Sequence, residues 1–273
     1  MKKNNSLLLS TPYIVWMVIF TLIPLGVVAY YAFTDPNTGA FSWANILELQ
    51  NYMPVLWQSI LYSLVSALIC LLLGYPVAYF IAHQREMMQK ILYMLVMLPM
   101  CMSFLLRTLA WVGLLQDTGI INNLLGLIGI GPIHMIRTPG AVILGMVYNY
   151  LPYMILPLYS IIVKIDNRLI EAAEDLGCNS FHVFTKVIFP LSMPGILSGL
   201  TMVFVPAVST FYISQKLGGT DTVLIGDVIE RQFKQGNNAN LGAALSLLLM
   251  VLVFICTGIM NRLGADEEGG VVI

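Results

Sequence analysis

Apolar residues are concentrated in six long segments of the chain, and the charged residues lie almost entirely between them. Each segment holds 22 to 25 residues, and about 20 residues of α-helix are enough to cross the hydrocarbon core of a bilayer. The pattern therefore predicts an all-α membrane protein with six transmembrane helices. Their expected limits are residues 12–33, 59–82, 91–115, 139–163, 192–214 and 240–261.

Lys and Arg are divided unequally between the two sides that these spans define. One side holds eight of them and the other holds four. Because cytoplasmic loops carry an excess of Lys and Arg, the side with eight is expected to be the cytoplasm, and both termini lie on it. The cytoplasmic segments are then 1–11, 83–90, 164–191 and 262–273, and the outer segments are 34–58, 116–138 and 215–239.

Composition supports the membrane class. Only 10% of the 273 residues are charged and 58% are hydrophobic, whereas soluble domains carry about a quarter charged residues. The net charge of −1 gives no support for a nucleic acid partner, and the expected surroundings are a lipid bilayer. The first apolar stretch has 22 residues, longer than the core of about 7–15 residues in a cleaved signal peptide, so we expect an uncleaved first span.

Three parts are expected along the chain. They are a first helix with its outer loop (1–58), a helical core (59–262) and a short acidic cytoplasmic tail (263–273). The four cysteines show no spacing typical of a metal site, and no metal is expected.

The longest cytoplasmic segment, 164–191, contains the charged stretch NRLIEAAEDLG at residues 167–177. Asn167 is the expected N-cap of a short helix, and Gly177 is its expected stop. A second short helix is expected from Asn179 or Ser180 to just before Pro190.

This segment is too long for a simple connection. It has 28 residues, whereas helix–helix connections usually have about 2–8. Its first helix has one small and apolar face, which lets another backbone approach closely. We therefore favour a docking element for another protein over a solvated connector.

The same segment resembles the EAA loop of permease subunits in bacterial binding-protein-dependent ABC importers. That pattern is EAA, three residues, Gly, nine residues and then Ile-x-Leu-Pro. Val187 and Phe189 replace the Ile and the Leu, and the register is kept. The matching residues are Glu171, Ala172, Ala173, Gly177 and Pro190.

The resemblance implies a MetI-like, type I permease fold in which this loop docks on a cytoplasmic ATPase. The coupling residues would be Glu171, Ala172, Ala173, Gly177, Val187 and Pro190. Segments over nearly the whole chain are also similar to the permeases of polyamine (spermidine/putrescine) importers. They are RTLAW (107–111), TPGAVILGMVYNYLP (138–152), MPGILSG (193–199) and GGTDTVLIGDVI (218–229).

In such importers two related permeases form the channel. The resemblance therefore implies a second permease subunit, two copies of the ATPase, which use ATP and Mg, and an extracytoplasmic polyamine-binding protein. This chain itself would bind no cofactor.

A polyamine path needs carboxylates for the ammonium groups and aromatic faces for cation–π contacts. Acids and aromatic residues occur near the outer ends of the expected spans. Aromatic residues there more often form an interfacial belt, which remains the alternative for each of them. The candidate path residues are Trp111, Asp117, Asp227, Trp43, Tyr148 and Tyr212.

Arg107 is the one clearly charged residue within an expected span. A charge there costs about 2.5–3.5 kcal/mol or more and marks a functional residue by default. Because a polyamine is itself a cation, a structural or gating role is favoured over substrate contact. An ion pair with Asp117 and snorkelling to the interface are the alternatives.

No enzyme site is expected in this chain. The three histidines are scattered, no nucleophile–base pair is evident, and the phosphate-binding motif GxxxxGK[ST] does not occur. Two alternatives to polyamine import remain open. They are an importer permease for another small organic solute and an ion-driven secondary transporter, although the latter would need an acid relay that the spans lack.

Overall fold

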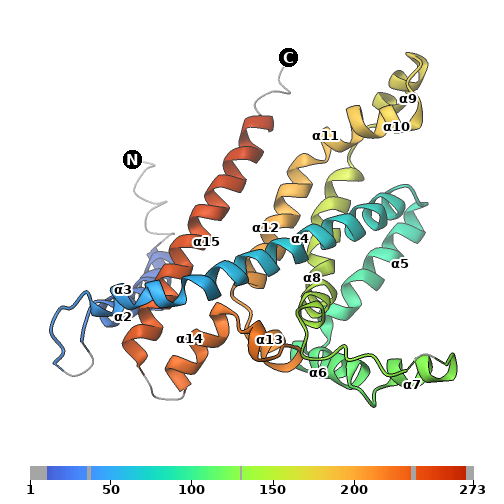
Figure 1. Cartoon of the computed structure of the whole chain (residues 1–273). Helices are drawn as coiled ribbons and strands as arrows, with labels where there is room; N and C mark the ends of the chain where they lie inside the picture. The colour runs from blue at the N-terminus through green and yellow to red at the C-terminus, as the bar shows by residue number, and fades with distance from the viewer. Residues whose placement is uncertain (1–10, 36–37, 130, 235–237, 269–273) are drawn as a thin grey trace, which may run out of the picture. The chain divides into compact units, whose positions relative to one another are not determined.

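The computed structural model (Figure 1) describes residues 11–35, 38–129, 131–234 and 238–268, with side chains beyond Met260 only for Arg262. The basic start of the first cytoplasmic segment and the acidic side chains of the tail lie outside this description. Helices are the regular elements of the described residues, and one isolated bridge joins Thr34 and Phe41.

The helices are numbered in chain order, with η for 3₁₀ or π turns. They are η1 (Val18–Leu22), α2 (Ile23–Ala32), α3 (Ala44–Glu48), η2 (Leu49–Tyr52), α4 (Met53–Ala82), α5 (Glu86–Met97), η3 (Leu98–Cys101), α6 (Phe104–Leu115), α7 (Ile120–Leu127), α8 (Pro139–Ile162), α9 (Asn167–Asp175), α10 (Ser180–Val183), η4 (Phe184–Ile188), α11 (Phe189–Leu191), α12 (Met193–Val208), α13 (Tyr212–Leu217), η5 (Thr220–Thr222), α14 (Ile225–Lys234) and α15 (Ala239–Glu268).

Among the described residues, five helical segments are long and apolar enough to cross a membrane. A sixth span results if two helical stretches that meet at a bend of 62° are counted together, which agrees with the expected six. The side of the membrane on which the chain ends lie stays a prediction. The five segments are Thr11–Ala32, Ala44–Ala82, Phe104–Leu127, Pro139–Ile162 and Ala239–Met260, and the bent pair is Ser180–Leu191 with Met193–Val208.

The third expected span, 91–115, is not one helix, so that prediction was wrong. Helix α5 ends at Met97, the 3₁₀ turn η3 contains Pro99, and the backbone is extended at Met102 before α6 begins. Proline has no N–H to donate and crowds the preceding turn, which interrupts a helix. Arg107 consequently lies in the first turn of α6 rather than deep in a continuous helix.

The fifth expected span, 192–214, was also too long. Helix α12 ends at Val208, two residues after Pro206, and α13 begins at Tyr212. The Ser209 hydroxyl donates to the carbonyl oxygen of Val205 at 3.2 Å, which satisfies one of the last carbonyls of the helix. Tyr212 therefore lies on a separate short helix.

The chain forms two compact units, and the smaller one comprises Met1–Pro54 and Val228–Leu252. Within it, two buried asparagines hold the end of α2. The Nδ2 atoms of Asn45 and Asn240 donate to the carbonyl oxygen of Thr34, at 2.9 and 2.6 Å. Asn45 also donates to Ala32 at 3.2 Å. These bonds satisfy carbonyls that have no partner within α2.

The larger unit comprises Val55–Asp227 and Val253–Ile273, and the packed pair of α8 and α12 lies in its core (Figure 1). Gly195 and Gly199 are one turn apart on α12, and both are buried against α8. A Cβ atom at Gly195 would lie 3.2 Å from the carbonyl oxygen of Pro157, and one at Gly199 would lie 2.6 Å from the Met154 sulfur. Small residues at this spacing allow close packing of membrane helices.

Replacing Gly199 with leucine is expected to destabilise the α8–α12 pair. Overpacking a close contact costs about 1–3 kcal/mol. The change should lower the melting temperature of the purified protein in detergent. The measurement is size-exclusion chromatography with fluorescence detection of a tagged chain.

Gly258→Leu on α15 is the matched control, because a Cβ atom there meets nothing within 4 Å. Equal melting temperatures for the two variants would contradict the packing account.

Candidate functional site

Helix α9 contains the EAA residues and begins after Asp166. The carboxylate of Asp166 accepts the backbone N–H of Arg168 at 3.0 Å. Asp166 is therefore the N-cap, and the prediction of Asn167 was wrong by one residue. Both residue types cap helices well, but an acid also interacts favourably with the positive end of the helix dipole.

Gly177 ends α9, as predicted. Its φ of +85° lies in the left-handed region, which glycine adopts without a steric cost. The N–H of Gly177 donates to Glu174 at 2.8 Å, and the N–H of Cys178 donates to Ala173 at 3.1 Å. This pair of bonds is the Schellman motif, which satisfies the last carbonyls of a helix. The turn therefore depends on glycine at this position.

The surface of α9 is apolar along one face and open to solvent. Leu176 is 86% exposed, Leu169 is 49% exposed and Phe181, just beyond the turn, is 70% exposed. Glu171 and Ala172 are exposed as well, and Ala173 is half-buried. A short amphipathic helix with large exposed apolar side chains is a suitable surface for helix-in-groove binding.

The second half of the loop, residues 180–191, forms a nearly continuous helical arm. Asn179 caps it by accepting the N–H of His182 at 2.9 Å. The predicted end before Pro190 was wrong, because α11 runs through Pro190 to Leu191. The preceding turn is the π-helix η4, and such a wider turn accommodates a proline that cannot donate to the residue four positions earlier.

The arm has buried side chains, whereas α9 has none. Val183 and Ile188 are buried, Val187 is half-buried and Pro190 is exposed. The six predicted coupling residues thus fall into two groups. Glu171, Ala172, Ala173 and Gly177 lie on or beside the solvent-exposed α9, and Val187 and Pro190 lie on the arm.

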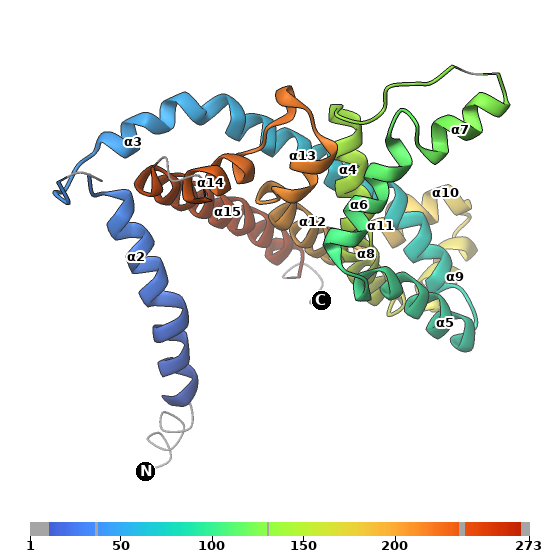
Figure 2. The same cartoon turned by 90° about the horizontal axis from the view of Figure 1, so that it is seen from below.

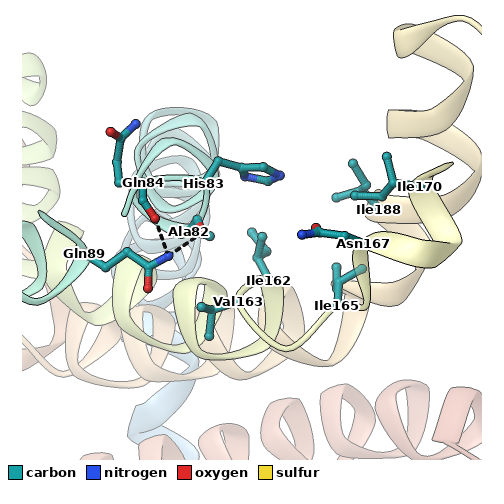
Figure 3. Close-up of a pocket in the computed structure, with 10 residues that line it drawn as sticks. All are labelled: Ala82, His83, Gln84, Gln89, Ile162, Val163, Ile165, Asn167, Ile170 and Ile188. Atoms are coloured by element: carbon teal, nitrogen blue, oxygen red, sulfur yellow. Dashed lines mark hydrogen bonds between the residues drawn. The ribbon is translucent and has the colours of Figure 1, made fainter. Parts of the chain in front are cut away.

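A cavity of about 300 Å³ lies between the start of α9, the end of α8 and the turn from α4 to α5 (Figure 3). His83 and Asn167 point toward each other across it. Gln89 holds the turn, since its Nε2 atom donates to the carbonyl oxygens of Ala82 and Gln84, both at 2.8 Å. Sequence reasoning missed this cavity, because no local pattern brings these segments together.

Three of the predicted path residues lie on helices that meet one another, α6, α8 and α13 (Figure 2). Trp111 of α6 and Tyr148 of α8 are in edge-to-face contact, with ring centroids 5.3 Å apart. Tyr212 of α13 lies 6.2 Å from Phe104 of α6, and the Lys216 ammonium lies 5.7 Å from the Tyr212 ring. The Trp111–Tyr148 pair supplies aromatic faces that can attract a cation, whereas the Tyr212 ring already has the Lys216 ammonium over it.

Arg107 is 6% exposed, and its Nε and Nη1 atoms have no hydrogen-bond partner within the described residues. The structure does not show the alternative, an ion pair between Arg107 and Asp117. Asp117 instead lies beside His134, with Oδ1 3.0 Å from Nδ1, and both side chains are largely exposed. Burying guanidinium nitrogens without hydrogen-bond partners is costly, so burial of Arg107 does not by itself stabilise the chain.

Two other predicted path residues have surroundings of their own. Asp227 is 2% exposed, and its Oδ2 atom accepts the N–H of Leu224 at 2.9 Å at the start of α14. Trp43 lies in the smaller unit, where it packs edge-to-face on Phe33 and Phe41 at 5.3 and 5.5 Å.

Comparison with known sequences matches this chain to curated permeases. It is 39% identical over 257 residues to the spermidine/putrescine transport system permease protein PotB of Haemophilus influenzae, with 90% of each chain covered. It is 37% identical over 248 residues to the PotB protein of Escherichia coli, which covers 87% of this chain and 90% of that protein.

Solved structures show the same fold at low identity. A chain of a bacterial ABC transporter that imports the acidic polysaccharide alginate matches with a TM-score of 0.81 and 19% identity, over 97% of this chain and 96% of that one. A chain of the MetNI methionine ABC transporter matches with a TM-score of 0.62 and 17% identity, over 79% of this chain and 95% of that one. The predicted all-α permease fold is thereby confirmed.

The family model described as "binding-protein-dependent transport system inner membrane component" matches residues 74–266. This range begins at Gly74 of α4 and includes α9, the arm and the whole of α12. Together with the sequence matches, it shows that the chain belongs to the family of inner membrane components of binding-protein-dependent transport systems.

Proposed function

We propose that this chain is one of two permease subunits of an ATP-driven polyamine importer. Its relatives with 36–39% identity are named as spermidine/putrescine permeases and match about nine-tenths of this chain. That identity, over both compact units, is the observation that carries the proposal. A second permease, two ATPase copies and an extracytoplasmic polyamine-binding protein complete the importer.

ATP-driven motion enters this chain through α9. The exposed Leu169, Leu176 and Phe181 form an apolar surface that fits a groove of a cytoplasmic ATPase. ATP and Mg are used by that ATPase, and this chain supplies the moving parts without a catalytic site of its own. Closure of the ATPase would push on α9 and shift the helices between two rigid packings.

The polyamine path passes the aromatic group of Trp111, Tyr148 and Tyr212. The Trp111 and Tyr148 rings offer cation–π faces and apolar contact for the methylene stems of a polyamine, whereas the Lys216 ammonium already lies over the Tyr212 ring. Trp43, Asp117 and Asp227 stay predictions for this path. Arg107 has a gating role, because a buried positive charge repels the cationic substrate in one state of the path.

Glu171→Lys and Gly177→Val are expected to leave the protein inserted but to release the ATPase. The first reverses a charge on the exposed surface of α9, and the second places a β-branched residue at a φ of +85°. The measurement is the amount of ATPase that copurifies with the membrane-inserted chain.

Glu86→Lys, an exposed charge reversal at the start of α5, is the control. Copurified ATPase and transport at wild-type levels in both loop variants would refute the docking role.

Trp111→Ala is expected to lower spermidine uptake about two- to thirty-fold at low substrate concentration, the range that one cation–π contact accounts for. Trp57→Ala, an exposed tryptophan of α4, is the control for loss of an interfacial anchor. The assay is uptake of labelled spermidine into proteoliposomes that hold the complete importer.

The same assay distinguishes polyamines from another small solute. Unlabelled putrescine should compete with spermidine, whereas alginate fragments and methionine should not. If neither polyamine is taken up by a complex that hydrolyses ATP, the substrate is of another class.

A further inference from the structure

The two helical stretches of the bent pair meet at one buried residue, Ser192. It follows the last residue of α11 and precedes the first residue of α12, where the axes turn by 62°. Ser192 is fully buried, and its N–H donates to Ile188 at 2.9 Å and to Phe189 at 3.2 Å. The bend is therefore a defined joint between the arm and the membrane helix.

A hydroxyl pair crosses this joint to α4. The Tyr75 hydroxyl lies 2.8 Å from the Ser192 Oγ atom, and Ser192 donates to the carbonyl oxygen of Phe189 at 2.9 Å. Because a serine hydroxyl has one hydrogen, Tyr75 then donates to Ser192. Both side chains are buried, and hydrogen bonds in such low-dielectric surroundings are strengthened.

The Tyr75 ring contacts the arm as well. It lies edge-to-face on Phe184, with centroids 5.5 Å apart, and 6.1 Å from Phe189. One side chain of α4 thus touches η4 and α11 with its ring and reaches the joint with its hydroxyl. Any movement of the arm must carry α4 with it or break these contacts.

In the first part of the loop, helix α9 has no buried side chain. The start of α9 borders the cavity of Figure 3, and Leu176 at its end is 86% exposed. A push on α9 is therefore transmitted through the arm, where the chain is packed.

We propose that Tyr75 is a positioning residue that couples movement of the arm to α4 and α12. This inference rests on the proposed function, in which an ATPase docks on α9. The hydrogen-bond chain from Tyr75 through Ser192 to Phe189 keeps the arm from swinging freely at the joint. Without the phenolic hydroxyl, ATP hydrolysis proceeds while the membrane helices follow the arm incompletely.

The test compares uptake and ATP hydrolysis in proteoliposomes with the complete importer, using spermidine as the substrate. Tyr75→Phe keeps the ring and removes the hydroxyl. Spermidine imported per ATP should fall about two- to ten-fold, the range expected from one buried hydrogen bond. Copurified ATPase and the melting temperature should stay near wild type.

Tyr79→Phe is the matched control. Tyr79 lies one turn further along α4, and its ring is 6.3 Å from Phe184, but its hydroxyl makes no hydrogen bond within the described residues. Ser192→Ala should reproduce the Tyr75→Phe defect. It provides the same test if Tyr75→Phe fails to fold. The double variant should be no worse than either single one, because both remove the same interaction.

A wild-type ratio of import to hydrolysis in Tyr75→Phe and Ser192→Ala would overturn this inference alone. Loss of the ATPase from the Tyr75→Phe complex would also overturn it, since the hydroxyl would then support docking and not coupling. If the wild-type chain carries no ATPase, the proposed function fails as well, so the two failures are distinguishable.

Discussion

The close packing of α8 against α12 is the interaction on which the rest of the larger unit depends. Lipid tails are as apolar as these helices, so their association gains little from the hydrophobic effect and relies on close contact. Gly195 and Gly199 allow that contact with Pro157 and Met154. In α4, Gly74 packs on Met154 as well, with only 3.1 Å available to a Cβ atom. Glycines on α4 and α12 thus allow close packing of these two helices on α8.

This packed group connects the two candidate sites. Tyr148 lies in the first half of α8, beside Trp111, and the end of α8 borders the cavity beside α9. Helix α12 begins at Ser192, the joint of the arm. Because packed helices resist continuous deformation, a movement of the arm shifts them as rigid bodies. The fold therefore links α9 to the aromatic residues through packed helices, without a contact between the two candidate sites.

Buried polar residues show how far environment changes the role of a side chain. Asp227, a predicted path residue, is buried at the start of α14, where its carboxylate accepts the N–H of Leu224. Arg107 was expected deep in a long helix, but the interruption after Pro99 places it in the first turn of α6. Asp117 lies beside His134 instead of Arg107. Each difference comes from backbone breaks and neighbours that hydropathy does not register.

The sequence alone determined the number of spans, the positions of α9 and the arm, and the glycine turn at Gly177. These features follow from local chemistry, namely runs of apolar residues long enough for a bilayer and a glycine that ends a short helix. The tertiary structure alone decided the contact between Tyr75 and Ser192, which are 117 positions apart, and the cavity beside α9. It also decided where helices break, because a proline is tolerated or interrupts a helix according to how its neighbours satisfy the freed carbonyls.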